Sequence, residues 1–193
     1  MKLVIIDYGA GNIKSIQFAT ERLGYRAILS RNEDEIRSAD KVLFPGVGEA
    51  NSAMRKLRES GLDLVIPTLK QPVLGICLGM QLLCNSSEEG NTRGLGIFDV
   101  DVLRFKSDVK VPQIQWNSIK NLKTSLFNNI EEAAYIYMVH SYYAPLTAAT
   151  IAASNYGVDY SAALAKNNFY GTQFHPEKSS STGEQILKNF LEM

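Results

Sequence analysis

The 193-residue sequence has few cysteines and no excess of charge of either sign. Its 2 cysteines are too few for a disulfide framework, so a reducing cytoplasm is the simplest setting. Lys and Arg together number 20, as do Asp and Glu, and the net charge is therefore zero. Because a nucleic-acid binder needs a basic excess to neutralise phosphates, this balance argues against a nucleic acid as partner.

Long apolar runs, repeats and linkers are also missing. No uncharged apolar run approaches the roughly 18 residues of a membrane-spanning helix, so we expect no membrane partner. Segment 1–12 has one lysine, a short apolar run that ends at Asp7, and no small-residue cleavage site, which favours a first strand over a signal peptide. Hydrophobic residues make up 45% of the chain, enough for a packed core, and we expect residues 1–193 to form one domain.

The first half of the sequence alternates strand-like apolar runs with helical patterns. The expected strands span 2–7, 25–29, 41–48 and 72–77, and the expected helices span 12–24, 32–39, 49–60, 62–70 and 78–86. Asn12 and Gly24 are candidate caps of the first helix, and the fourth helix is expected to break near Pro67. This alternation predicts parallel pairing of the strands, with helices on both faces of the sheet.

The second half changes character and carries most of the tyrosines. Strand-like runs span 96–105, 114–120, 134–144, 150–156, 160–166 and 169–174. The chain closes with a helical pattern over 179–193, in which Ser181 and Glu184 have the spacing of a capping box. The whole pattern predicts an α/β fold: an open, mostly parallel sheet with helices on both faces, plus an antiparallel strand section.

Glycines near the N-terminus suggest a dinucleotide site, but the pattern is incomplete. Gly9 and Gly11 follow a strand and precede a helix, whereas the third glycine of G-x-G-x-x-G is replaced by Lys14. No suitable acidic residue ends the strand at 25–29. A tight turn between strand and helix explains these glycines better.

The two cysteines differ in their sequence context. Cys84 falls inside the expected helix 78–86, where a cysteine is usually a small buried apolar residue. Cys77 directly follows the apolar strand 72–76, and Gly75 and Gly79 flank it at two residues on either side. This G-x-C-x-G spacing is that of a nucleophile elbow, with sulfur in place of the serine oxygen. The alternative is a buried cysteine in a glycine-rich turn.

An elbow at Cys77 places the sulfur at the carboxyl end of the sheet, where open α/β folds bind ligands. The helix that follows directs its positive N-terminus at a thiolate and at a developing oxyanion. The turn 44–48, Phe-Pro-Gly-Val-Gly, is a second strand-to-glycine turn that can supply oxyanion donors, although an ordinary βα turn has the same pattern.

A cysteine nucleophile needs a base, and the sequence has only 2 histidines. His175 ends the strand-like run 169–174, and Glu177 follows two residues later. In an extended segment these side chains point the same way, so Glu177 can hold the imidazole in one orientation, as the third member of a triad does. His140 is expected to be structural or to line the substrate site.

Three motifs together resemble a known family. The segments GICLGMQLL, FPGVG and QFHPEKS are similar to the nucleophile, oxyanion and His-Glu motifs of class I (triad-type) glutamine amidotransferases. IDYGAGN near the N-terminus and HSYY at 140–143 point more narrowly to the glutaminases of imidazole glycerol phosphate synthase, which serve histidine biosynthesis. The resemblance spans nearly the whole chain.

The resemblance implies a mechanism without a cofactor or a metal. Cys77 attacks the side-chain amide of glutamine, His175 acts as base and then as acid toward the leaving ammonia, and Glu177 orients His175. The products are glutamate and ammonia, formed through a covalent thioester. The remaining implied site residues are Val47, Gly48 and Leu78 for the oxyanion hole, and Gln81, Ser141 and Tyr142 for the substrate.

The family also implies a partner. Ammonia is mostly protonated in neutral water, and ammonium is not a nucleophile, so family members pass ammonia directly into a second protein. Here that partner is expected to be a (β/α)₈-barrel cyclase that forms a heterodimer with this chain. Matching family positions place the docking surface at Asn12, Trp116, Tyr137 and Lys178.

The sequence departs from the family pattern at two places. Gln115 stands where the family usually has glycine, and Glu49 and Ala50 stand where alanine and phenylalanine are usual. Both changes are expected near the partner face, so a paralogue that feeds another synthase, such as one for a cell-surface sugar, is an alternative. A non-catalytic regulatory domain on the same scaffold and a cysteine protease are alternatives of other classes.

Overall fold

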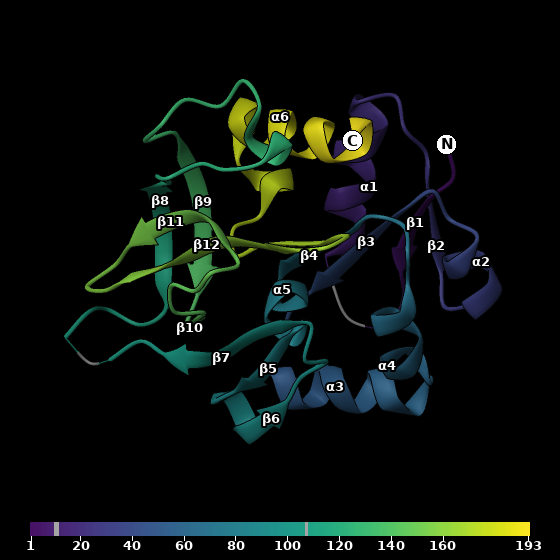
Figure 1. Cartoon of the computed structure of the whole chain (residues 1–193), viewed down its shortest axis with the longest axis horizontal. Helices are drawn as coiled ribbons and strands as arrows, with labels where there is room; N and C mark the ends of the chain where they lie inside the picture. Colours follow the sequence, from purple (N-terminus) through teal and green to yellow (C-terminus); the bar gives the residue numbers. More distant parts are fainter. Residues whose placement is uncertain (10–11, 107) are drawn as a thin grey trace.

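The computed structural model describes residues 1–9, 12–106 and 108–193, and Figure 1 shows the whole chain. Within these residues the largest sheet has seven strands in the order β11-β12-β13-β4-β3-β1-β2. These strands are β1 (Leu3–Ile6), β2 (Ala27–Ser30), β3 (Lys41–Gly46), β4 (Val73–Cys77), β11 (Thr150–Asn155), β12 (Asp159–Lys166) and β13 (Phe169–Thr172). β13, β4, β3, β1 and β2 run parallel, whereas β12 pairs in antiparallel fashion with both β13 and β11. The expected α/β fold with its antiparallel section is confirmed.

The other strands form two smaller sheets. Four of them pair in the order β10-β7-β5-β6, and two form the ribbon β8–β9. Their bounds are β5 (Cys84–Ser87), β6 (Thr92–Arg93), β7 (Phe98–Arg104), β8 (Gln113–Ser118), β9 (Tyr135–His140) and β10 (Tyr142–Tyr143). β13 follows the antiparallel strands in the chain but lies beside β4, so the C-terminal quarter of the sequence completes the central sheet.

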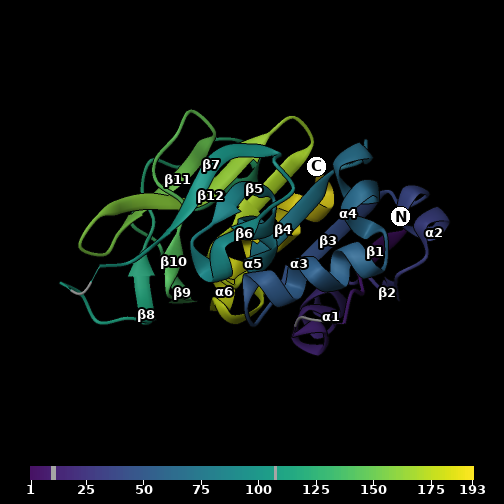
Figure 2. The same ribbon diagram turned by 90° about the horizontal axis from the view of Figure 1, so that it is seen from below.

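Helices cover both faces of the central sheet, as Figures 1 and 2 show. The helices are α1 (Ile13–Arg22), α2 (Glu33–Arg37), α3 (Ala50–Glu59), α4 (Leu62–Val65), α5 (Leu78–Leu82) and α6 (Ser180–Glu192). Short 3₁₀ helices are η1 (Ile66–Thr68), η2 (Glu89–Asn91), η3 (Ser125–Phe127) and η4 (Pro176–Lys178). The break expected near Pro67 is the change from α4 to η1.

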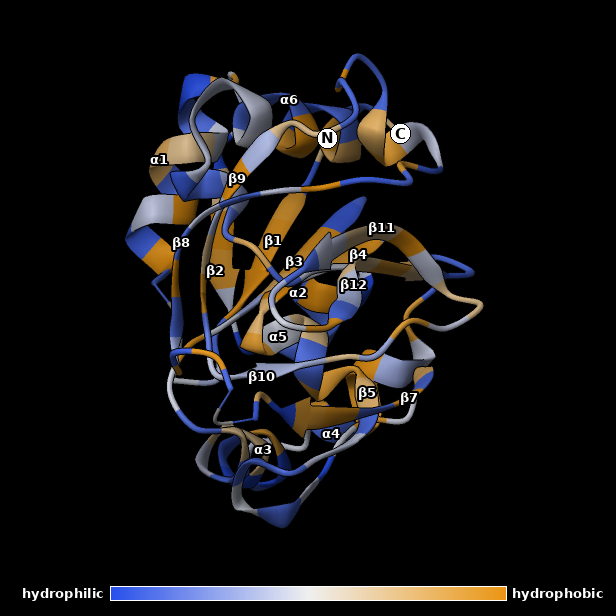
Figure 3. Ribbon diagram, turned by 90° about the vertical axis from the view of Figure 1, so that its left-hand side faces the viewer, coloured by the Kyte–Doolittle hydropathy of each residue, from blue (hydrophilic) through white to orange (hydrophobic). Residues whose placement is uncertain are grey.

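The hydrophobic pattern of β1 explains the layers. Leu3 and Ile5 pack into the cluster that α1 and α6 cover, whereas Val4 and Ile6 pack into the cluster under α3 and α4. All four side chains are buried, because a parallel strand in the middle of such a sheet has no solvent face. Figure 3 shows the same arrangement as apolar central strands enclosed by more polar outer segments.

Two local predictions are wrong. The expected helix 78–86 ends at Leu82, and Cys84 begins strand β5, which pairs with β7. Asn85, Ser86 and Ser87 are poor helix formers, so pairing with a neighbouring strand prevails. The capping box at Ser181 is also wrong, because α6 already begins at Ser180.

Candidate active site

Cys77 lies at the junction of β4 and α5, in the geometry of an elbow. Its backbone has φ 54° and ψ −111°, a conformation that non-glycine residues rarely adopt. A Cβ atom at Gly79 would overlap the carbonyl oxygen of Phe44, and one at Gly75 would lie 2.8 Å from Leu83 Cδ1. Glycine at both positions therefore allows β3, β4 and α5 to cross closely and lets the strand turn sharply at Cys77.

The sulfur of Cys77 has two polar neighbours from other elements. It lies 3.9 Å from the carbonyl oxygen of Val139 in β9, and Nε2 of Gln173 lies 3.8 Å from it. Both cysteines are free thiols. Cys84 is completely buried, and burial raises the pKa of its thiol, so it remains an inert thiol.

His175 follows β13 and is held from both sides. Its Nδ1 lies 2.8 Å from Oε1 of Glu177, and the Glu177 side chain is only 1% exposed. Its backbone N–H donates to the carbonyl of Tyr137, and its own carbonyl accepts from the hydroxyl of Ser179. Glu177 therefore contacts the imidazole as expected, but it does so from the 3₁₀ helix η4 and not from the extended segment that the sequence predicts.

The charge of His175 reflects these neighbours. Burial alone lowers its pKa, but hydrogen bonding with Cys77 and Glu177, together with their negative charges, more than offsets burial and raises the pKa to about 10. The ring is therefore protonated at neutral pH and carries a proton that it can donate.

A pocket of about 310 Å³ contains Cys77 and His175. Every residue assigned by resemblance to the oxyanion hole or the substrate also lines it: Val47, Gly48, Leu78, Gln81, Ser141 and Tyr142. Its remaining lining residues are Glu89, Pro112, Val139, His140 and Lys178. The volume suits a small molecule of the size of an amino acid and is too small for a folded peptide segment.

The turn after β3 faces the elbow. Gly48 has φ +94°, a conformation suited to glycine, and Val47 is 39% exposed. The hydroxyl of Tyr8 donates to the carbonyl of Pro45 at 2.9 Å, and burial keeps this hydroxyl neutral by raising its pKa. Leu78 is the first residue of α5, so its N–H has no partner within the helix.

Glu49 and Ala50, which depart from the family pattern, have a structural explanation. The Glu49 carboxylate accepts from the N–H groups of Asn51 and Ser52 and so caps α3. The N–H of Ala50 donates to Oε2 of Glu89 at 2.9 Å. The substitution at 49 therefore supplies a helix cap.

Glu89 is a pocket residue that the sequence did not reveal. Burial raises its pKa above the ordinary range, and the bond from Ala50 opposes this shift. Its position depends on η2, which brings Glu89 to the N-terminus of α3 from a segment with no recognisable local motif.

Both amide hydrogens of Gln81 are committed to protein acceptors. Nε2 donates to the carbonyl of Tyr142 at 3.0 Å and to Oε1 of Gln173 at 2.9 Å. Only the Gln81 oxygen remains for a ligand, so a ligand group that meets it must be a hydrogen-bond donor.

His140 lines the pocket but is buried and uncharged. Burial lowers its pKa to about 4, although the bond between Nδ1 and the Tyr142 carbonyl, 2.8 Å long, opposes this shift. Since a carbonyl only accepts, Nδ1 carries the proton. The other ring nitrogen is buried without a partner among the described residues.

The residues assigned to a docking surface come from neighbouring elements. Trp116 of β8 and Tyr137 of β9 are cross-strand partners whose ring centroids lie 6.1 Å apart, and Trp116 is 46% exposed. Lys178 ends η4, which packs against α1, the helix that follows Asn12. Gln115, in place of the usual glycine, has ordinary strand pairing with Met138.

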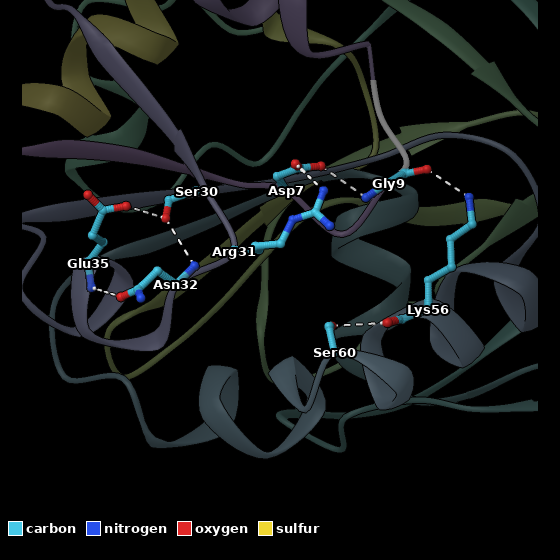
Figure 4. Close-up of polar contacts among 8 residues, drawn as sticks. All are labelled: Asp7, Gly9, Ser30, Arg31, Asn32, Glu35, Lys56 and Ser60. Carbon is cyan, nitrogen blue, oxygen red and sulfur yellow. Dashed lines mark hydrogen bonds and ion pairs between the residues drawn. The ribbon is translucent and has the colours of Figure 1, made fainter.

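The turn after β1 is filled by contacts within the protein (Figure 4). Asp7 accepts from the N–H of Gly9 at 3.0 Å and from Arg31 at 2.8 Å, while Lys56 donates to the carbonyl of Gly9 at 2.7 Å. Gly11 lies outside the described residues. These contacts occupy the polar groups that a dinucleotide phosphate would need.

Neither a membrane-spanning helix nor a metal-binding cluster is present in the part of the chain that the structure describes. None of its helices has the length and apolar character needed to cross a membrane. It contains no group of three or more His, Cys, Asp or Glu side chains placed to hold a metal ion.

Comparison with known proteins identifies the family. The model of glutamine amidotransferase class-I matches residues 4–193. The imidazole glycerol phosphate synthase subunit HisH of Bacteroides fragilis is 54% identical over 196 residues and covers 100% of both chains. The protein of the same name from Haemophilus influenzae is 46% identical over 194 residues, covering 100% of this chain and 98% of its own length.

Solved structures share the fold at low sequence identity. A glutamine amidotransferase crystal structure is 17% identical with a TM-score of 0.76, covering 98% of this chain and 97% of its own. PurLQS from Thermotoga maritima is 16% identical with a TM-score of 0.74, covering 99% of this chain and 97% of the matched chain. Because the family model matches residues 4–193, nearly the whole chain, the chain belongs to the class I glutamine amidotransferases.

Proposed function

We propose that this chain is the glutaminase subunit of an imidazole glycerol phosphate synthase in histidine biosynthesis. The observation that carries the glutaminase reaction is the position of His175, which interacts with Cys77 and with Glu177 in one small pocket. The choice of synthase is supported by relatives of that name that are 45–54% identical over at least 98% of this chain.

In the proposed reaction the Cys77 sulfur attacks the side-chain carbonyl carbon of glutamine. His175 carries the proton that the Cys77 thiol has given up and passes it to the departing nitrogen, so the carbon–nitrogen bond breaks and ammonia leaves. A thioester remains on Cys77, and water activated by His175 hydrolyses it to glutamate and free thiol. Glu177 holds the imidazole and balances its positive charge throughout.

The oxyanion that forms in each half-reaction needs donors close to the sulfur. Val47 and Gly48 on the turn after β3 and Leu78 at the start of α5 line the pocket beside Cys77. We assign their backbone N–H groups to this role, which the N-terminus of α5 reinforces electrostatically.

The amino-acid end of glutamine carries an ammonium group and a carboxylate, so it needs both hydrogen-bond acceptors and donors. Backbone groups of Ser141 and Tyr142 are assigned to the amino-acid end. The free oxygen of Gln81 and the carboxylate of Glu89 both accept hydrogen bonds, so they suit the ammonium group of the substrate. Glu89 is thus an addition to the residues assigned from the sequence.

The acceptor of the ammonia is proposed to be a (β/α)₈-barrel cyclase that docks at Asn12, Trp116, Tyr137 and Lys178. Lys178 both lines the pocket and is exposed, so this surface adjoins the place where ammonia forms. Direct transfer there would keep ammonia unprotonated on its way to the cyclase and yield imidazole glycerol phosphate. We further propose that residues 1–193 act as one domain in the cytoplasm, where amino acids are made.

Glutamate release in the presence of the purified cyclase and its ligand tests the proposal. Stimulation by the cyclase is expected, and Cys77→Ala should remove the stimulated activity. Cys84→Ser is the matched control, because Cys84 lies outside the pocket, and it should retain the activity. Stimulation by a different synthase, but not by the cyclase, would assign the same chemistry to another pathway.

A further inference from the structure

Gln173 is a completely buried polar residue that the proposed mechanism does not use. It lies between β13 and His175, and its side chain is enclosed by the elbow and by α5. Its backbone N–H donates to the carbonyl of Ala162 at 2.8 Å, so the main chain there is held without help from the side chain. A buried amide costs free energy unless its polar atoms are used, and both are used here.

The orientation of the Gln173 amide follows from its neighbours. The Tyr142 carbonyl can only accept, so the Gln81 atom that faces it must be the NH₂ group. The second hydrogen of that NH₂ group needs an acceptor, which makes the facing atom of Gln173 its oxygen. The Gln173 nitrogen is therefore the atom that faces the Cys77 sulfur at 3.8 Å.

The sulfur thus has different partners in its two protonation states. A thiol can donate its proton to the carbonyl of Val139, 3.9 Å away. A thiolate can only accept, and it then takes hydrogen bonds from Gln173 Nε2 and from the protonated His175. The Val139 carbonyl thus suits the thiol, whereas the Gln173 amide suits the thiolate, which is the nucleophilic form.

We propose that Gln173 is a further catalytic residue, whose Nε2–H donates to the charged sulfur of Cys77 and stabilises the thiolate. The inference rests on the proposed function, in which Cys77 is the nucleophile. Gln81 acts through Gln173, because the bond from Gln81 fixes which atom of the amide meets the sulfur. Gln81 is in this respect a positioning residue, in addition to its assigned contact with substrate.

Thiol alkylation of the full chain by iodoacetamide at pH 7 tests the donor directly, because it needs neither glutamine nor the cyclase. Gln173→Met keeps an unbranched side chain of similar length but removes the N–H donor. Cys77 alkylation should slow about tenfold, the effect of losing one charge-assisted hydrogen bond. In the cyclase-stimulated reaction, kcat should fall by a similar factor with KM changed less than about twofold, because the sulfur and not substrate binding is affected.

Gln113→Met is the matched control. Gln113 is also completely buried, but it bonds to Tyr160 and has no contact with the Cys77 sulfur. The control should lose stability as the Gln173 variant does, yet alkylate at the wild-type rate. Equal slowing in both variants would mean that the effect is structural and would overturn the proposal.

Gln173→Leu provides a second variant should the methionine variant fail to fold. The unaltered chain offers an independent measurement, since alkylation of Cys77 should shift the side-chain amide resonances of Gln173 more than those of Gln113 in NMR spectra. The role of Gln173 alone would be overturned if either folded variant had the wild-type alkylation rate and the wild-type kcat. Unshifted Gln173 resonances would overturn it as well. Retained glutamate release in Cys77→Ala would instead overturn the proposed function itself.

Discussion

His175 and Glu177 form a buried pair in which the imidazole Nδ1 lies 2.8 Å from the carboxylate Oε1. The carboxylate is nearly inaccessible to water, so its negative charge acts on the ring with little screening. The pair orients the ring and directs its other nitrogen away from Glu177. It also contributes to the raised pKa of His175, about 10.

Glu177→Gln should preserve the size of the side chain but remove its charge. The pKa of His175 should fall from about 10, and kcat for glutamate release should drop by about ten-thousandfold, as expected for a triad that loses its orienting carboxylate. An NMR titration of His175 and steady-state kinetics measure the two effects. The control is Glu192→Gln on α6, an exposed carboxylate whose loss should leave both unchanged.

Gly48→Ala tests the turn after β3. Gly48 and Gly24 both have positive φ, +94° and +85°, and a Cβ at either position meets no atom within 4 Å. Alanine at either site should therefore cost about 1 kcal/mol of unfolding free energy through backbone strain. Only Gly48→Ala should lower kcat, because Gly48 lines the pocket and Gly24, which follows α1, does not. Equal kcat values in the two variants would exclude an oxyanion role for the turn.

His140 should make the protein sensitive to acid. Its folded pKa of about 4 lies below the ordinary 6.5, so the unfolded chain binds this proton more readily. The stability associated with neutral His140 is fully present above pH 6.5 and is lost as the pH falls through 4. Between pH 7 and 4.5 the loss amounts to about 2 kcal/mol.

His140→Asn removes this titration while its amide can still donate to the Tyr142 carbonyl. Urea unfolding at pH 7 and 4.5 should show that the unfolding free energy decreases less between these pH values in the variant than in the wild type. Carboxylates contribute equally to both proteins and cancel in the comparison. His175 stays protonated in the folded protein throughout this range, because its folded pKa of about 10 lies above it. Equal losses of unfolding free energy in the variant and the wild type would contradict the assignment of the effect to His140.

Trp116→Ala tests the docking surface. Trp116 is exposed on β8 and stacks edge-on against Tyr137, so truncation should weaken binding of the cyclase by at least about thirtyfold, as for an interface tryptophan. Calorimetric titration of the cyclase measures this change. Leu64→Ala is the control and should leave binding unchanged. Leu64 is 75% exposed on α4, and this helix covers the face of the central sheet opposite to α1 and α6.

The parts of the site that lie within one short segment could be predicted from the sequence. Gly75, Cys77 and Gly79 specify the elbow by their spacing, and His175 and Glu177 lie two residues apart. The alternation of strands and helices likewise predicted the parallel sheet, because hydrophobic periodicity is local.

Features that depend on distant segments could not be predicted. Gln173 reaches the sulfur only because β13 pairs with β4, and Glu89 reaches the pocket only because η2 meets the start of α3. The sequence pattern places Cys84 in a helix, because a strand of only four residues that pairs with β7 leaves no periodic signal. Ser181 matched a capping pattern, but the backbone of α6 begins one residue earlier.

The overlap that any side chain at 79 would create with the Phe44 carbonyl has a mechanical consequence. β3 and α5 are in direct backbone contact there, with no side chain between them to repack, so they must move as one rigid piece. Any adjustment of the backbone N–H groups that we assign to the oxyanion hole on this turn is therefore confined to the peptides between Gly46, where the strand ends, and the Glu49 cap. The hinge of such a motion is only two residues long, Val47 and Gly48.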